Sequence, residues 1–114
     1  MAISPVFGIV SSGLAFETKR LEVSANNVAN VTTPGFVPSQ VVGQEAPGGG
    51  VSGFVQPLTG NFAFDPIFTE ALPSGTSLIQ EAATQITALA AYKAQIAVFR
   101  TEDEILNSVV NMRT

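Results

Sequence analysis

Apolar side chains recur every seven residues near the start of the chain. A seven-residue repeat of large apolar positions, separated by small ones, is typical of closely packed helices. Ser4 can cap such a helix, and Pro5 suits its first turn because the missing N–H is unpaired there anyway. The pattern predicts a helix over residues 4 to about 31. Its large seam positions are Phe7, Leu14, Leu21 and Val28, and the small ones are Ser11, Thr18 and Ala25.

A second helix is predicted over residues 77 to about 112. It opens with Ser77-Leu78-Ile79-Gln80, a capping box in which the first and last side chains can each satisfy a free backbone N–H. At 1.5 Å per residue it would be roughly 50 Å long, too long for a compact protein of this size, whose radius of gyration is about 13 Å. The chain is therefore predicted to be elongated. The helix has one row of positions that are apolar or aromatic except Asp103, namely 79, 82, 86, 89, 92, 96, 99, 103, 106 and 110.

The middle of the chain is rich in proline and glycine. Residues 32–76 hold six of the seven prolines, and Gly48-Gly49-Gly50 makes a flexible break. Short β-like runs lie near residues 36–42, 51–56 and 62–64, each bounded by Pro or Gly. This segment forms either brief β hairpins or an irregular loop that orders on contact. The predicted fold is mainly α, with two long terminal helices in coiled-coil-type packing, and divides into residues 1–36, 37–76 and 77–114.

The composition favours a protein that is buried against other chains. Hydrophobic residues make up 46% of the 114 residues and charged residues only 12%, about half the usual charged fraction. So few charges cover a small surface poorly, and burial in an assembly is the simplest resolution, although an apolar monomer is the alternative. The net charge of −4 argues against nucleic acid as a partner.

Candidate catalytic chemistry is sparse. The chain has neither Cys nor His, so the usual nucleophile, general base and transition-metal ligand are missing, and we expect no cofactor or metal. The acidic triplet Glu102-Asp103-Glu104 is interpreted as a solvated patch partly paired with Arg100. In the first helix, Glu17 can pair with Arg20, and Lys19 with Glu22, on a solvated or interface face. An enzyme is therefore the weaker hypothesis.

No targeting or membrane segment is expected. Residues 3–16 are uncharged and mostly apolar, but they lack a basic flank and run directly into a charged amphipathic pattern, unlike a signal peptide. No stretch approaches the roughly 20 apolar residues of a membrane span. If the protein leaves the cytoplasm, we expect an export route without a cleaved signal.

The end of the first helix carries the most distinctive string, from Ala25 to Phe36. Its three asparagines (26, 27 and 30) end the helix and can offer side-chain amides to neighbouring backbone. Thr33 precedes proline and is pushed extended, while Pro34-Gly35 fits the central pair of a type II turn that needs positive φ at the glycine. An ordinary helix stop followed by a turn would explain these features equally well.

The whole string resembles the N-terminal signature of the flagellar axial proteins (rod, hook and related subunits), in which Ala-Asn-Asn-x-Ala-Asn leads into Thr-Pro-Gly-Phe. Ser12-Gly13-Leu14 and Lys19-Arg20-Leu21 are similar to that family's first helix, and residues 91–95 and 100–106 to its last. Gln95 stands where the family more usually has asparagine. The short middle segment makes the chain most like a proximal-rod subunit.

The resemblance implies a structural subunit of the bacterial flagellar basal-body rod. Such a subunit is exported by the flagellar type III apparatus and joins other rod subunits and copies of itself in a torque-transmitting tube across the periplasm. The rival class is a soluble coiled-coil adaptor or export chaperone, which shares the heptads but does not need the Asn-rich stop. The predicted assembly interface consists of Phe7, Leu14, Leu21, Asn26, Asn27, Val28, Asn30, Pro34, Gly35, Phe36, Ile86, Leu89, Tyr92, Ile96, Phe99, Leu106 and Val110.

Overall fold

A computed structural model describes residues 4–58 and 76–112. Along the chain it contains helix α1 (Ser4–Ala29), strands β1 (Ser39–Glu45) and β2 (Val51–Pro57), and helix α2 (Leu78–Met112). The predicted class, mainly α with two long terminal helices and a hairpin between them, is confirmed. The third β-like run, at residues 62–64, lies outside the described residues.

The start of α2 follows the predicted cap. The Ser77 hydroxyl accepts a hydrogen bond from the backbone N–H of Gln80 at 3.4 Å, and the Ser77 carbonyl accepts the first helical bond, from Glu81, at 3.0 Å. The N-cap half of the capping box is therefore present, and α2 begins at the residue after Ser77.

The middle segment forms an antiparallel hairpin. Its register runs from Ser39 opposite Pro57 to Glu45 opposite Val51. The three successive glycines 48–50 take φ values of 88°, 101° and 87°, which side-chain-bearing residues rarely adopt. In the loop that they form, the Ala46 N–H donates to the Gly50 carbonyl at 3.0 Å. The triple glycine is thus the hairpin turn.

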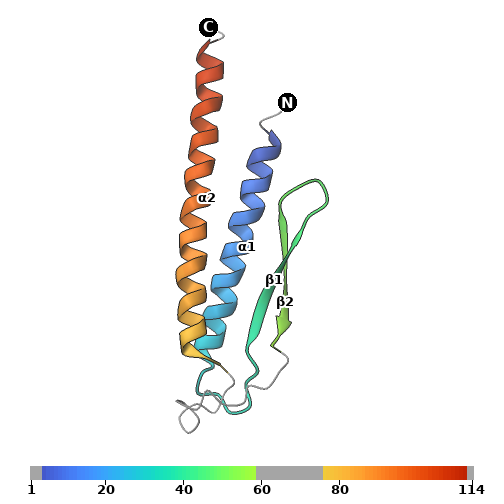
Figure 1. Ribbon diagram of the computed structural model, residues 1–114, viewed down its shortest axis with the longest axis vertical. Coiled ribbons are helices and arrows are strands. Elements are labelled where there is room, and N and C mark those ends of the chain that lie inside the picture. The colour runs from blue at the N-terminus through green and yellow to red at the C-terminus, as the bar shows by residue number, and fades with distance from the viewer. Residues whose placement is uncertain (1–3, 59–75, 113–114) are drawn as a thin grey trace.

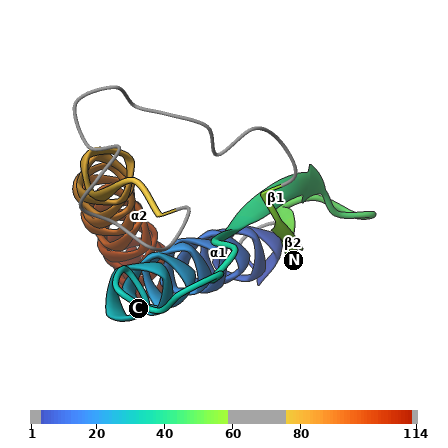
Figure 2. The ribbon, with the colours of Figure 1, turned by 90° about the horizontal axis from the view of Figure 1, so that it is seen from below.

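Helix α1 lies at the centre of the molecule, with α2 and the hairpin on different sides of it (Figures 1 and 2). Among the described elements, α1 packs against α2 and both strands, whereas α2 does not pack against the hairpin. The two helices are antiparallel, and the C-terminal part of α2 extends beyond the start of α1 (Figure 1). The radius of gyration is 18.9 Å and the extents are 68 × 24 × 18 Å, so the predicted elongation is confirmed.

The interior contains more polar than apolar side chains. Among the described residues, the buried hydrophobic side chains are Val10 and Ala88. Buried polar and charged side chains outnumber them, and they are Glu17, Ser24, Asn27, Thr76 and Glu81. Many large apolar side chains of the two helices are half-buried, and hydrogen bonds between the fully buried polar groups add directional contacts to the packing of α1 on α2.

Candidate assembly interface

The turn after α1 has the predicted geometry. The Phe36 N–H donates to the Thr33 carbonyl at 3.2 Å, which places Pro34 and Gly35 at the centre of the turn. Gly35 has φ of 74°, as the second central residue of a type II turn requires. Phe36 is half-buried, whereas Pro34 and Gly35 are exposed. The chain thus reverses at this point and returns along α1 as β1.

Asn27 joins three segments of the chain. Its Nδ2 donates to the Ser39 carbonyl at 2.8 Å, and its Oδ1 accepts from the Ser39 N–H at 3.0 Å. The same Nδ2 also donates to Oε1 of Glu81, on α2, at 2.9 Å. The Asn27 carbonyl accepts from the hydroxyl of Thr76 at 3.2 Å. With a side chain only 1% exposed, Asn27 ties α1 to β1 and to the start of α2.

The other two asparagines act locally. Nδ2 of Asn30 donates to the Asn26 carbonyl at 2.9 Å, which satisfies an acceptor of the last helical turn. The Thr33 hydroxyl donates to Oδ1 of Asn30 at 3.0 Å. Asn26 is exposed and Asn30 half-buried. The side chains of Asn27 and Asn30 bond to backbone groups as predicted, whereas the Asn26 side chain, among the described residues, contacts only the Asn30 side chain. Of the three, Asn27 alone reaches other elements in the described part of the chain.

One turn before Asn27, Ser24 continues the polar contact between the helices. Its hydroxyl donates to the Glu81 carbonyl at 3.3 Å and accepts from Nε2 of Gln85 at 3.1 Å. Ser24 is 1% exposed. We call the contact formed by Glu17, Ser24, Asn27, Glu81 and Gln85 the polar seam.

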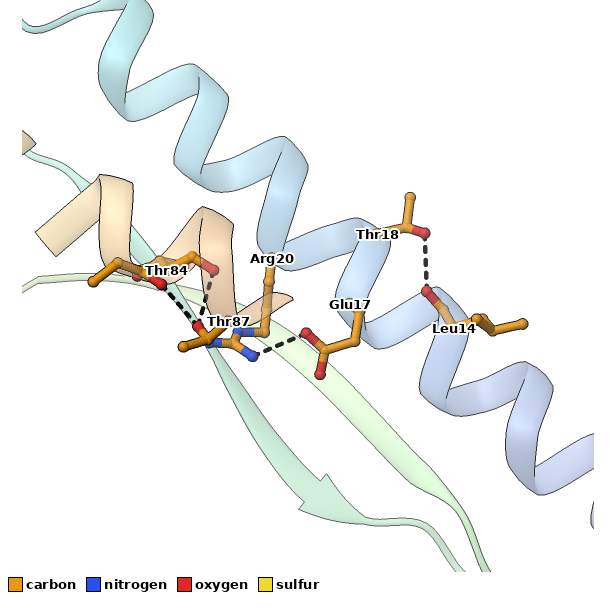
Figure 3. A network of polar contacts seen from close by, with 7 residues as sticks. Leu14, Glu17, Thr18, Arg20, Thr84 and Thr87 are labelled. Carbon is orange, nitrogen blue, oxygen red and sulfur yellow. Dashed lines mark hydrogen bonds and ion pairs between the residues drawn. The ribbon is translucent and has the colours of Figure 1, made fainter. Parts of the chain in front are cut away.

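The middle of the polar seam is an ion pair (Figure 3). Arg20 donates from Nη1 to Oε2 of Glu17 at 2.9 Å, and from Nη2 to the hydroxyl of Thr87, on α2, at 3.4 Å. The predicted Glu17–Arg20 pair is present, and of the two faces considered for it, solvated or interface, the burial of Glu17 at 5% exposure agrees with the interface. Glu17 lies on the stripe that packs against α2, and its carboxylate retains a charged donor there. Lys19 does not pair with Glu22 but donates to the Gly53 carbonyl at 3.1 Å.

The upper part of the helix contact is a close approach followed by an aromatic pair. A Cβ at position 13 would lie 2.8 Å from the carboxamide carbon of Gln95, so the amide lies flat over Gly13. Oε1 of Gln95 is buried without a hydrogen-bond partner among the described residues. Beyond Gln95, the ring centroids of Phe7 and Phe99 are 4.8 Å apart, and the two ring planes are tilted by 54° relative to each other.

The hairpin is held to α1 at several points. The Ser12 hydroxyl accepts from the Val51 N–H at 3.1 Å, and Lys19 bonds to β2 as described. The ring of Phe16 covers two facing glycines, since a Cβ would lie 3.0 Å from it at Gly43 and 2.7 Å at Gly53. The missing side chains of the hairpin therefore make room for Phe16.

The predicted α1 seam lies beside the buried stripe. Phe7, Leu14, Leu21 and Val28 are all half-buried, and the small positions 11, 18 and 25 are exposed. The buried positions are Val10, Gly13, Glu17, Ser24 and Asn27. This stripe follows the same heptad spacing but is displaced by three residues from the apolar one. Its small and polar side chains gave no hydrophobic signal, so only their period could have identified it.

The predicted α2 row winds around its helix. Ile86 and Leu89 are 69% and 47% exposed, whereas Tyr92 and Ile96 are half-buried. From Ile86 to Leu89 to Tyr92 the row takes two three-residue steps in succession, and each of them rotates it by about 60° around the helix. The row therefore begins on the outer face and turns toward α1. Of its later members, Phe99 is 39% exposed, Leu106 is half-buried and Val110 is 54% exposed.

Helix α2 exposes two apolar strips. We call Ile79, Ile86 and Leu89 the lower strip, and Val98, Ile105, Val109 and Met112 the upper strip; all are 45% exposed or more. At 100° per residue, the two strips point in directions roughly 120° apart. Surfaces of this kind on one helix mark contacts with other molecules.

The charged groups beside an open pocket near the start of α2 already have hydrogen-bond partners. This pocket of about 500 Å³ lies between α1, β1 and the start of α2, and its lining includes Arg20, Asn27 and Glu81. Each of these side chains holds a partner within the polar seam.

No cluster of acidic residues suited to a metal occurs in the described part of the chain. None of its described helices has the length and apolar character of a membrane span. Within the same residues, no ion pair joins Arg100 to the acidic triplet.

Comparison with known proteins identifies the N-terminal part. Residues 9–36 match the model of a family described as flagella basal body rod protein. The matched span covers most of α1, Asn27 and the Pro34-Gly35 turn, which confirms the resemblance found in the sequence. No curated protein matches the chain. The match supports a structural role in the flagellar rod and a location in the flagellar basal body.

Proposed function

We propose that this chain, whose residues 9–36 belong to the flagella basal body rod protein family, is a proximal-rod subunit that assembles through its terminal helices. Its partners are copies of itself and other rod subunits, and the assembled tube transmits torque. The flagellar type III apparatus exports it without a cleaved signal. The observation that carries the assembly role is the exposed apolar surface of α2.

The exposed strips favour assembly because the isolated chain leaves them in water. Fully burying one large apolar side chain contributes roughly 1.5–3 kcal/mol, before ordering entropy is subtracted. The two strips face different sides of α2, so one neighbouring helix cannot cover both. A subunit inside a tube has neighbours on several sides and can bury both strips.

The predicted interface residues divide by position. Ile86, Leu89 and Val110 are exposed and available to neighbouring subunits. Leu14, Leu21 and Val28 are half-buried beside the polar seam and can complete a contact only when another helix covers them. The turn residues Pro34 and Gly35 direct the chain back along α1, and we assign them a positioning role.

The first experiment compares apolar and acidic substitutions in motile cells. Leu21→Ala and Ile96→Ala should reduce rod formation and motility while secretion of the subunit continues, since each loses roughly 2–5 kcal/mol if fully buried in the tube. Glu102→Gln and Glu104→Gln are the matched controls and should leave both readouts unchanged. If the glutamate variants abolish motility while the apolar variants do not, the structural-subunit proposal fails.

Sedimentation distinguishes a rod subunit from an adaptor or export chaperone. We expect monomer at low concentration and an open-ended polymer at high concentration, because heterologous contacts whose rotation does not close a ring generate open helical filaments. A defined small oligomer at all concentrations would instead favour the adaptor. We also expect little protection from hydrogen exchange at the start of α1 and the end of α2 in dilute monomer, because these parts of the helices have few partners within one chain.

A further inference from the structure

The contacts between α1 and α2 share one antiparallel register. Asn27 bonds to Glu81, Ser24 to Gln85, Gly13 lies under Gln95, and Phe7 stacks on Phe99. Each step toward the start of α1 is thus accompanied by a similar step toward the end of α2. The question is which of these contacts excludes a shifted pairing.

The apolar contacts cannot exclude a shift of one heptad. Tyr92, Phe99 and Leu106 are spaced seven residues apart, and each could face Phe7. The apolar positions of α1 repeat with the same period. A shift by seven residues would therefore exchange one apolar contact for another of similar size, at little cost.

The hydrogen bond between Asn27 and Glu81, at the other end of the helix pair, does distinguish the observed register from the shifted ones. In one shift Asn27 would face Ala88, whose side chain offers no acceptor, and in the opposite shift it would lie beyond the start of α2 at Leu78. Either shift leaves one N–H of the buried Asn27 amide without its partner. An unpaired buried donor costs about 1–3 kcal/mol, and one polar position can specify the register of a helix pair in this way.

We propose that Glu81, acting through Asn27, is the residue that sets the register of α2 against α1. Its carboxylate is the acceptor that only one register brings to the Asn27 amide. Asn27 is itself held by both backbone groups of Ser39, so the acceptor must come to it. This role concerns the folding of a single chain and does not depend on the proposed function. It also determines how far the C-terminal part of α2 extends beyond the start of α1 (Figure 1).

Cross-linking measures the register directly, because the chain has no cysteine of its own. Phe7→Cys is combined with Tyr92→Cys, Phe99→Cys or Leu106→Cys, and each pair is treated with a short bis-maleimide at low protein concentration. In the otherwise unchanged chain, the 7–99 pair should cross-link at least about tenfold faster than the other two. Adding Glu81→Leu should reduce this preference to about threefold or less, since the N–H of Asn27 that does not bond to Ser39 then has no Glu81 carboxylate to meet in any register.

Two variants make the result specific. Glu81→Gln retains an acceptor oxygen and should restore the preference for the 7–99 pair. Glu104→Leu makes the same substitution at an exposed position of α2 and should leave the preference unchanged. Helical content is followed by circular dichroism throughout.

Three results would overturn the proposal. The first is an unchanged preference in the Glu81→Leu variant, and the second is an equal loss in Glu104→Leu. The third is loss of helical content in Glu81→Leu, because Glu81 would then be needed for stability and not for the choice of register. Retained helicity with relaxed cross-linking supports the proposal.

Discussion

The inner and outer faces of α2 differ in chemistry and in specificity. The inner face meets α1 through hydrogen bonds of Glu81 and Gln85 and through the close approach of the Gln95 amide to Gly13. The outer face carries the exposed strips, where apolar side chains provide non-directional attraction. Hydrogen bonds contribute modestly to stability but depend on geometry, whereas apolar burial is strong and tolerant of position. The directional hydrogen bonds of α2 therefore lie inside the subunit, and its exposed apolar strips lie on the surface.

The two ends of α1 show the same division on a smaller scale. The end near Asn27 is held by four buried polar side chains, Ser24, Asn27, Thr76 and Glu81, and by the two bonds between Asn27 and the Ser39 backbone. The start near Phe7 has one tilted aromatic pair. We therefore expect the end near Asn27 to determine how α1 pairs with α2, and the start near Phe7 to open more readily. The predictions below test this difference.

The largest effect is expected at Asn27. Asn27→Ala removes both bonds to Ser39 and leaves the carboxylate of Glu81 buried without its donor, which should destabilise the helix pair by about 3 kcal/mol or more. Urea unfolding of the dilute chain, followed by circular dichroism, measures this change. Asn26→Ala is the control, because Asn26 is exposed and makes only local contacts. Equal losses in the two variants would contradict a special role for Asn27.

The outer face should respond only in the assembly. Ile86→Ala and Leu89→Ala should leave urea unfolding of the dilute chain nearly unchanged, since both side chains are already exposed. Each should raise the critical concentration for polymerisation. The free energy of adding a subunit becomes less favourable by about 2 kcal/mol if the side chain is fully buried between subunits. Pelleting assays over a concentration series provide the measurement. A loss of monomer stability without an effect on polymerisation would show that Ile86 and Leu89 act within the subunit and not between subunits.

The turn after α1 should show a pure backbone effect. A Cβ at Gly35 would meet no atom within 4 Å, so only its φ of 74° opposes a substitution. Gly35→Val should cost about 1–3 kcal/mol and impair rod assembly, because a β-branched residue adopts this conformation poorly. Gly35→Asn should cost less, since asparagine tolerates positive φ. Motility and secretion are compared for both variants, and normal motility in Gly35→Val would show that the turn geometry is dispensable.

The smallest effect is expected at the exposed acidic residues. Glu104→Gln should leave monomer unfolding and polymerisation unchanged, because its side chain is exposed and has no ion-pair partner in the described part of the chain. The same two assays, repeated at low and high salt, test this expectation. A clear loss of polymerisation at low salt would mean that charge pairs, in addition to apolar strips, hold the outer face.

Local signals in the sequence were sufficient for the elements and their ends. The heptad spacing and Ser77 identified both helices, and Pro34-Gly35 identified a turn whose φ the structure confirms. The hairpin was left open against an irregular loop, since a short run bounded by glycine suits either state. These features depend on neighbours within a few residues, and the sequence contains them directly.

The pairing of surfaces was decided by tertiary structure. Periodicity located apolar rows, but the buried stripe of α1 consists of small and polar side chains that a hydrophobic pattern does not reveal. The meeting of Asn27 with Ser39 and Glu81 arises only when the chain folds back on itself. The sequence determined which segments are helical and where they end. Which faces meet was decided by hydrogen bonds between residues more than fifty positions apart, such as Asn27 and Glu81, whose partners no local pattern specifies.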